Sequence, residues 1–142
     1  MTNNLIAVVG AAIIQNGRIL CAQRGSGKQL DGLWEFPGGK IEAGETPEVA
    51  LEREIREELL CHIEVDRKIC TSQYRYSFGT VELTTFVCHL LDDKPHLTEH
   101  KKFAWVEPNR LSDLEWAPVD QEAVRLLSEN LQGADVLDEE GK

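Results

Sequence analysis

The fold is decided by one stretch in the middle of the chain, GGKIEAGETPEVALEREIREEL, which runs from Gly38 to Leu59. Its second half predicts a helix, because Thr46 is a favourable N-cap and Pro47 suits the first helical position. Two sets of side chains recur on neighbouring faces of that helix. They are an apolar stripe (Leu51, Ile55 and Leu59) and an acidic group (Glu54, Glu57 and Glu58).

The acidic face has two interpretations. The ordinary one is a solvated helix face whose glutamates pair with Arg53 and Arg56. However, three carboxylates on one patch repel one another, and two arginines do not neutralise them all. We also expect residues 36–40 to place flexible backbone and carbonyl groups nearby. Clustered oxygen ligands are what Mg²⁺ or Mn²⁺ requires, so the spacing favours a divalent-metal site.

The remaining pattern is mostly that of strands. Residues 5–14 and 18–24 are strand-like runs that flank Asn16-Gly17, a strong hairpin signal. Residues 25–32 form an expected loop. We expect further strands at 68–77, 80–91 and 102–106, and an amphipathic helix at 118–131.

Length and composition predict one globular domain over residues 1–133 and an acidic, frayed tail over 134–142. The 142 residues include 42% hydrophobic and 28% charged residues, which is ordinary for a folded domain. The 25 acidic against 15 basic residues give a formal net charge of −10. Such a surface repels phosphate backbones, so we expect no binding to a nucleic-acid polymer.

The ends and the cysteines indicate a cytoplasmic protein that does not bind membranes. The N-terminus lacks the basic region of a secretory signal, and the apolar residues 5–14 are too few to cross a bilayer. The four cysteines form no CxxC pair and the four histidines show no zinc spacing. We therefore expect reduced, partly buried thiols.

The central stretch resembles the Nudix box of hydrolases that cleave nucleoside diphosphate linkages. Gly39, Glu45 and the run Arg53–Glu58 stand at that box's defined positions. Further segments resemble the MutT-like branch and extend the similarity to about Leu131: Gly32–Lys40, the N-terminal strands ending at Arg24, and Glu115–Asp120. The resemblance implies an α/β protein with the Nudix α/β/α sandwich, built on a mixed, partly antiparallel sheet.

One position departs from the box. Leu60 stands where the family has glycine, two residues after the last glutamate of the box. Glycine there suits a left-handed helix C-cap, and leucine in that conformation costs about 1 kcal/mol or more. All the carboxylates lie before Leu60, so this departure bears on the cap and not on the metal site.

The resemblance implies Mg²⁺-dependent hydrolysis, with Mn²⁺ as a possible substitute. The implied metal ligands are the Gly39 carbonyl, Glu54, Glu57 and Glu58, and Arg53 orients the glutamates by ion pairing. Arg53 is alternatively an exposed partner of Glu57, worth a few tenths of a kcal/mol. Glu99, six residues before Trp105, resembles a further metal ligand or water-activating base. Its loop position also suits an ordinary surface glutamate.

The resemblance also implies substrate-binding residues. Arg24 and Lys40 are candidates for phosphate or base contacts, although Lys40 also suits a solvated lysine. Phe36 belongs to the same set, and Phe78 is a candidate for stacking on the base or for core packing. Asp120 matches the position that contacts the base edge, and it also suits an N-cap of the last helix. An ionised aspartate only accepts hydrogen bonds, which leaves 8-oxoguanine and cytosine open.

These inferences predict an enzyme that splits a nucleoside triphosphate into a monophosphate and pyrophosphate. The expected role is sanitising the nucleotide pool of 8-oxo-dGTP-type substrates, as a monomer or weak dimer. The alternatives are CTP or modified dCTP, and ADP-ribose or a dinucleoside polyphosphate, which the short chain disfavours. A non-catalytic nucleotide-binding module is disfavoured because every acid of the box is present.

Overall fold

The computed structural model describes residues 5–27, 29–91, 94–98 and 100–132. The predicted acidic tail, 134–142, lies outside these residues. Within them the chain forms a seven-stranded sheet, two α-helices and two short 3-10 helices. The strands are β1 (Leu5–Gln15), β2 (Arg18–Gln23), β3 (Trp34–Glu35), β4 (Gly38–Lys40), β5 (Ile63–Tyr76), β6 (Gly79–Leu90) and β7 (Lys102–Val106). The helices are α1 (Pro47–Leu59), η1 (Pro108–Asp113), η2 (Pro118–Asp120) and α2 (Gln121–Gln132).

The long strand β1 is the centre of the sheet. It runs parallel to β6 on one side and antiparallel to β4 and β2 on the other. β5 pairs antiparallel with β6, while β3 and β7 both pair antiparallel with β2. The expected hairpin between β1 and β2 is present, with Asn16 and Gly17 both at positive φ. The sheet is therefore mixed, as predicted.

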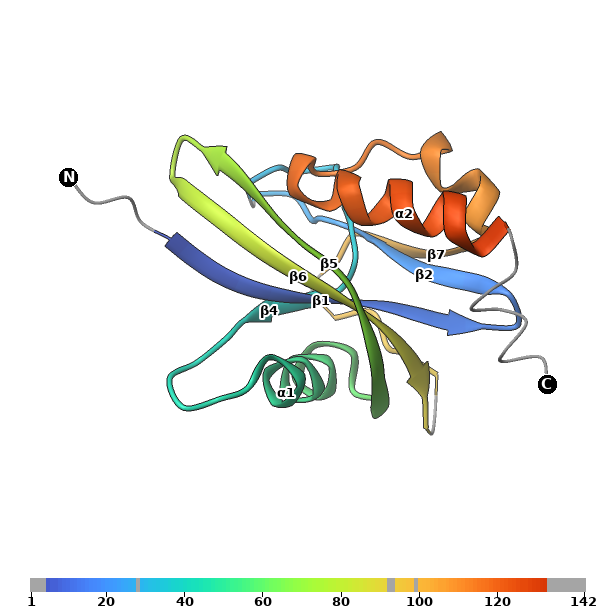
Figure 1. Cartoon of the computed structure of the whole chain (residues 1–142), viewed down its shortest axis with the longest axis horizontal. Coiled ribbons are helices and arrows are strands. Elements are labelled where there is room, and N and C mark those ends of the chain that lie inside the picture. Colours follow the sequence, from blue (N-terminus) through green and yellow to red (C-terminus); the bar gives the residue numbers. More distant parts are fainter. Residues whose placement is uncertain (1–4, 28, 92–93, 99, 133–142) are drawn as a thin grey trace.

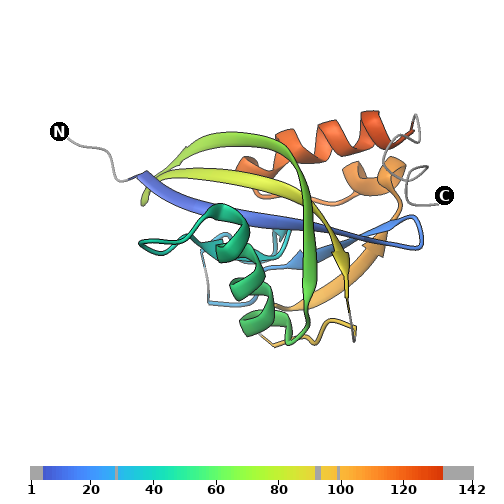
Figure 2. The same cartoon turned by 60° about the horizontal axis from the view of Figure 1, so that its bottom comes forward.

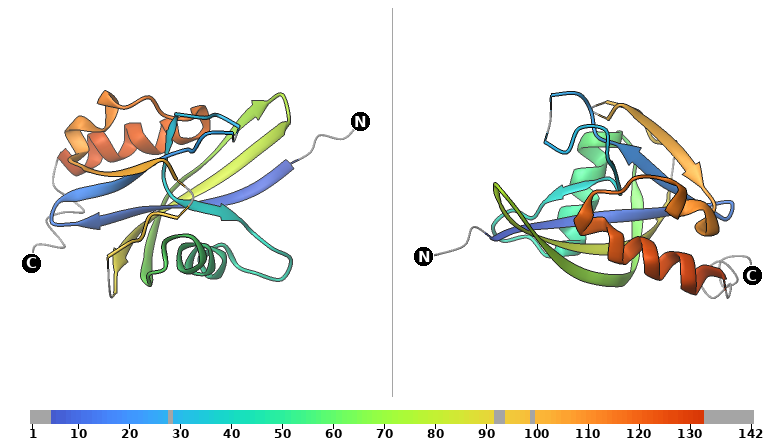
Figure 3. Two further views of the ribbon diagram at one scale, coloured as in Figure 1. Left: turned by 180° about the vertical axis from the view of Figure 1, so that it is seen from behind. Right: turned by 90° about the horizontal axis from the view of Figure 1, so that it is seen from above.

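Two helices cover opposite faces of this sheet, which gives the expected α/β/α sandwich (Figures 1 and 2). Along β1 the side chains alternate between the two cores. Val9, Ala11 and Ile13 pack in the core with α1, whereas Ala12 and Ile14 pack in the core with α2. This alternation is what a strand with both faces buried requires. The 3-10 segments lie on the α2 side, drawn in orange in Figure 3.

Helix α1 forms as the sequence predicts. The Thr46 side chain accepts a hydrogen bond from the Val49 N–H at 3.2 Å, and Pro47 begins the helix. Leu51, Ile55 and Leu59 are fully buried against the sheet. Each of these side chains contributes about 1.5–3 kcal/mol by burial, which fixes the helix rotation. The charged face therefore points away from the α1 core.

The segment before α1, where we expected flexible backbone, contains a short strand. Residues 38–40 are strand β4, paired with β1 in the register Val8–Lys40, Val9–Gly39 and Gly10–Gly38. At Gly38 a Cβ atom would overlap the Val9 carbonyl, so backbone packs directly on backbone there. The glycines thus allow close approach of two strands.

Three further expectations are tested by the structure. β5 starts at Ile63, earlier than expected, with register irregularities around Lys68 that interrupt its strand pattern. The last helix begins at Gln121, because 118–120 form η2 instead. None of the four cysteines forms a disulfide, and three of them are buried. None of the helices in the described part of the chain is long and apolar enough to cross a membrane.

Leu60 adopts the left-handed conformation that its place in the sequence predicts, with φ 56° and ψ 38°. Its N–H donates to the Arg56 carbonyl at 3.1 Å, and its side chain is 56% exposed. We expect Leu60→Gly to raise the free energy of unfolding by about 0.5–1 kcal/mol, because relief of the strain exceeds the added entropy of the unfolded chain. Urea unfolding measures this change. Asn16→Gly, at φ 54°, is the matched control and should change stability less, because asparagine tolerates this conformation. A lower stability of Leu60→Gly would contradict the strain argument.

Candidate active site

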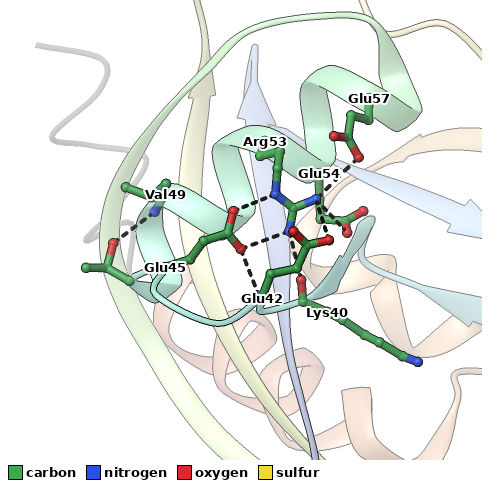
Figure 4. Close-up of polar contacts among 8 residues, drawn as sticks. Lys40, Glu42, Glu45, Val49, Arg53, Glu54 and Glu57 are labelled. Atoms are coloured by element: carbon green, nitrogen blue, oxygen red, sulfur yellow. Dashed lines mark hydrogen bonds and ion pairs between the residues drawn. The ribbon is translucent and has the colours of Figure 1, made fainter.

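Arg53 is the hub of the acidic face of α1 (Figure 4). Its Nε and one terminal nitrogen donate to the two Glu45 carboxylate oxygens at 2.6 and 2.9 Å, which is a bidentate pair. The same terminal nitrogen donates to the Lys40 carbonyl at 3.0 Å. The other donates to Glu54 at 3.2 Å and to Glu57 at 3.3 Å. The pair with Glu57, the alternative role, is present, but it is one of several contacts of a side chain that is only 15% exposed and that bridges α1 to the segment after β4.

In this arrangement the pKa values of two nearby carboxyls, Glu45 and Glu54, shift in opposite directions. Hydrogen bonds from Arg53, and then from the Glu42 N–H, lower the pKa of Glu45 to about 2. Burial raises the pKa of Glu54, and the charge of Glu57 adds to this rise, although Arg53 opposes it. Glu45 is therefore a fixed anion that holds Arg53. Glu54 carries a charge that its surroundings leave partly uncompensated.

Gly39 and Glu54 fit each other closely. A Cβ atom at position 39 would overlap the Glu54 carboxylate, so only glycine leaves room for that group beside the β4 backbone. The Gly39 backbone and Glu58 line one cavity. The donors at this end are carboxylate and carbonyl oxygens, which is the set that a hard divalent cation prefers. The predicted residues thus fit such an ion in type and in neighbourhood.

The three carboxylates share the predicted helix face but do not form a ready-made metal cluster in the described part of the chain. Across 5–27, 29–91, 94–98 and 100–132, no three acidic, histidine or cysteine side chains lie close enough to hold a metal ion. Arg53 holds the Glu54 and Glu57 carboxylates, and like charges repel. Glu99, the ligand or base predicted from the loop before Trp105, lies outside the described residues.

A cavity of about 490 Å³ connects this acidic end with the predicted base-binding residues. It brings together most of the sequence-predicted site: Arg24, Phe36, Gly39, Lys40, Glu58, Phe78 and Asp120. Arg53, Glu54 and Glu57 stand outside its described lining, on α1 beside it. A volume of this size is typical of small-molecule sites.

Asp120 is buried at the other end of the cavity, with 4% of its surface exposed. Its carboxylate accepts a hydrogen bond from the Phe36 N–H at 3.3 Å. Burial, and then the charge of Glu35, raises the pKa of Asp120 well above its usual value. A raised pKa favours the neutral acid, which donates as well as accepts, whereas the prediction from the sequence considered only the ionised form.

Aromatic side chains complete the base end. Phe36 is buried and packs on Trp116 with 4.7 Å between ring centroids. Phe78 is half-buried and lies parallel to Tyr76, with 5.0 Å between centroids and 4° between planes. Since Phe78 lines the cavity and not a core, the core-packing alternative for it is wrong.

A charged network that was not predicted from the sequence lies in the same cavity. Glu35 accepts from Arg24 at 2.8 Å and pairs with His100 Nε2 at 2.9 Å. Burial alone raises the pKa of Glu35, but the hydrogen bonds with His100 and Arg24 outweigh it and the net pKa is lowered. The His100 side chain is 7% exposed, and its Nδ1 has no hydrogen-bond partner among the residues that the structure describes. It stands in a polar loop without periodicity, so no sequence signal marks it.

The chain matches a known protein family over most of its length. The NUDIX domain model matches residues 4–137. The chain belongs to the Nudix family. A CTP pyrophosphohydrolase of Escherichia coli K12 is 36% identical over 118 residues, which is 82% of this chain and 86% of the relative. An 8-oxo-dGTP diphosphatase of Haemophilus influenzae is 34% identical over 130 residues, covering 87% of this chain and 93% of the relative.

A solved structure agrees with the same assignment. The DNA mismatch repair protein MutT of methicillin-resistant Staphylococcus aureus 252 is 46% identical and superposes with a TM-score of 0.76, covering 91% of this chain and 99% of that one. The chain is thus a Nudix hydrolase of the MutT-like branch. Nudix hydrolases generally use divalent metal ions, in keeping with the oxygen-rich end of the cavity.

Alanine substitutions at the two β4 glycines should affect different properties, stability at Gly38 and activity at Gly39. At Gly38 the added Cβ meets backbone, so we expect Gly38→Ala to lower the free energy of unfolding by about 2 kcal/mol or more. At Gly39 it meets the end of a side chain, so Glu54 moves and the fold survives. Gly39→Ala should therefore lower kcat by about a hundredfold at nearly unchanged stability. Full activity of a folded Gly39→Ala enzyme would contradict the fit between Gly39 and Glu54.

Glu45 should make stability depend on acid. Because its pKa is lowered to about 2 from 4.5, its contribution is complete above pH 4.5 and is lost as the pH falls toward 2. Glu45→Gln should therefore be less stable than the native chain at pH 7, and the gap should close in acid. Urea midpoints from pH 7 to about 3 measure it. Glu42→Gln is the control, because its carboxylate is exposed and 3.9 Å from Arg53. A gap that stays constant in acid would rule out the Glu45–Arg53 pair as its source.

Proposed function

We propose that the chain is a divalent-metal-dependent nucleoside triphosphate pyrophosphohydrolase that sanitises 8-oxo-dGTP-type nucleotides. The observation that carries this proposal is the single cavity that joins an oxygen-rich end to a base-binding end. A nucleoside triphosphate has the same polarity, with a metal-binding triphosphate at one end and a flat base at the other. The name of the Haemophilus influenzae relative supports this substrate class.

At the oxygen-rich end, the Gly39 carbonyl, Glu54, Glu57 and Glu58 would hold Mg²⁺ or Mn²⁺. When bound, such an ion neutralises charge on phosphate oxygens and lowers the pKa of a coordinated water. Arg53 and Glu45 fix the β4–α1 junction, and so hold these ligands in place before substrate arrives. Glu99 stays a prediction from the sequence, as a ligand or a water-activating base.

The chain's cations act on the substrate's charge. Lys40 is exposed at the cavity beside Gly39, where a phosphate oxygen would lie. Arg24 is held by Glu35 and by the Gln29 carbonyl at 2.6 Å, so its guanidinium is oriented in advance. Such preorganisation reduces the ordering cost of binding. The net charge of −10 does not prevent nucleotide binding in this proposal, because these two cations line the cavity that a small nucleotide would occupy.

At the base end, Asp120 and the rings of Phe36 and Phe78 would recognise the base. A neutral Asp120 donates and accepts, which matches the mixed donor and acceptor edge of 8-oxoguanine. The second candidate is CTP or a modified dCTP, favoured by the name of the Escherichia coli relative. An ionised Asp120 would accept from the cytosine amino group. We retain it as the alternative substrate class.

A substrate panel with two glutamate variants tests the proposal. With Mg²⁺, we expect pyrophosphate release and a kcat/KM for 8-oxo-dGTP more than about tenfold that for dGTP, a difference of about 1.4 kcal/mol. A smaller ratio with rapid CTP turnover would favour the cytidine alternative.

Glu57→Gln and Glu58→Gln should each lower kcat by about a hundredfold or more, because a carboxylate ligand is lost. Glu52→Gln, on an exposed position of the same helix, is the matched control and should keep full turnover. Normal turnover by both Glu57→Gln and Glu58→Gln would overturn the metal assignment.

A further inference from the structure

The residue before Asp120 is held on both sides of its backbone by strand β5. The Val119 N–H donates to the Tyr76 hydroxyl oxygen at 3.1 Å, and the Ser72 hydroxyl donates to the Val119 carbonyl at 2.8 Å. Both hydrogen bonds span more than forty positions of the chain. They are side chain–backbone bonds outside any strand ladder, so they depend on the identity of Tyr76 and Ser72.

The rest of the segment is hydrogen-bonded to the chain at and just after β3. The Ala117 N–H donates to the Trp34 carbonyl at 2.9 Å, next to β3 residue Glu35. The Phe36 N–H donates to Asp120 at 3.3 Å. The 3-10 turn η2 is therefore hydrogen-bonded to residues 34–36 and to strand β5. A turn of three residues has little hydrogen bonding of its own, so these outside contacts set its position.

Tyr76 is itself held firmly. Its ring stacks on Phe78 and lies against Tyr74 at 4.8 Å between centroids. Burial raises the pKa of the Tyr76 hydroxyl, which therefore stays neutral and can accept from Val119. Tyr76 lines the cavity, whereas Ser72 is absent from the described lining. The two hydroxyls therefore bind the same Val119 backbone, one from a residue that lines the cavity and one from a residue outside its described lining.

We propose that Tyr76 and Ser72 are specificity-determining positioning residues, which set the position of the Asp120 carboxyl by holding the Val119 backbone. Asp120 is a buried group at the end of the cavity, so a small movement changes the angle of any hydrogen bond that it makes to a base. Hydrogen bonds weaken steeply with misalignment. The pair of hydrogen bonds between the Val119 backbone and the hydroxyls of Tyr76 and Ser72, which we call the clamp, therefore affects the choice between bases. It leaves the chemistry at α1 unchanged.

This inference rests on the proposed function, and its test separates the two. The test compares Tyr76→Phe, Ser72→Ala and the matched control Tyr74→Phe, which removes a hydroxyl from the same strand without touching Val119. The first measurement is the ratio of kcat/KM between the triphosphate that the wild type prefers and the next best, among 8-oxo-dGTP, dGTP and CTP. The second is the ratio of Kd values for 8-oxo-dGMP and dGMP, which requires no turnover.

We expect Tyr76→Phe and Ser72→Ala each to reduce the discrimination ratio by about fivefold, the effect of losing one hydrogen bond. KM for the preferred substrate should rise while kcat stays within about twofold, because the metal ligands are untouched. Tyr74→Phe should keep the wild-type ratio. Thermal unfolding of all three variants shows that the fold is intact.

The outcomes are distinct. Wild type that binds 8-oxo-dGMP selectively but hydrolyses no triphosphate overturns the proposed function alone, and the Kd ratios still test the clamp. Unchanged selectivity in both Tyr76→Phe and Ser72→Ala overturns the clamp. A change in Tyr76→Phe but not in Ser72→Ala also overturns it, because Tyr76 would then act by touching the base. Absence of any monophosphate selectivity in the wild type overturns it as well.

Discussion

The site depends on one interaction, the bidentate pair between Arg53 and Glu45. It is almost shielded from water on both sides, with side chains 15% and 16% exposed, and it ties the middle of α1 to the segment after β4. Because the guanidinium also bonds the Lys40 carbonyl, it fixes the backbone beside Gly39. A planar group with five donors can satisfy several acceptors at once, which lysine cannot do. The acidic side chains of α1 are therefore arranged around the Arg53 guanidinium.

The sheet brings the residues around this pair into one cavity with the base-binding residues. β1 carries β4, and with it Gly39, on one edge, while β6 and β5 on its other edge bring Tyr76 toward η2 and Asp120. The acidic and aromatic ends are far apart in the sequence but share one cavity because both are attached to the same central strand. The excess of negative charge does not oppose a nucleotide there. Arg24 and Lys40 lie on the cavity wall, and the acids at its end are suited to a divalent cation.

Local signals predicted the elements well where propensity and packing agree. The Asn16-Gly17 hairpin, the Thr46-Pro47 helix start and the buried stripe at Leu51 were all present, because each depends on a few adjacent residues. Prediction was wrong at residues 36–40, where two glycines suggest flexibility. There the glycines serve close packing of β4 on β1, which no local pattern shows.

The sequence by itself determined the family, the helix that carries Arg53, Glu54, Glu57 and Glu58, and the candidate residues at both ends of the substrate. These follow from spacing, which a helix or hairpin converts directly into a shared face. Only the tertiary structure decided that Arg53 is a half-buried centre of hydrogen bonds, that Asp120 is buried with a raised pKa, and that Tyr76, Ser72, Glu35 and His100 support the cavity. Burial and long-range hydrogen bonds arise when distant strands meet, and so they leave no periodicity in the chain.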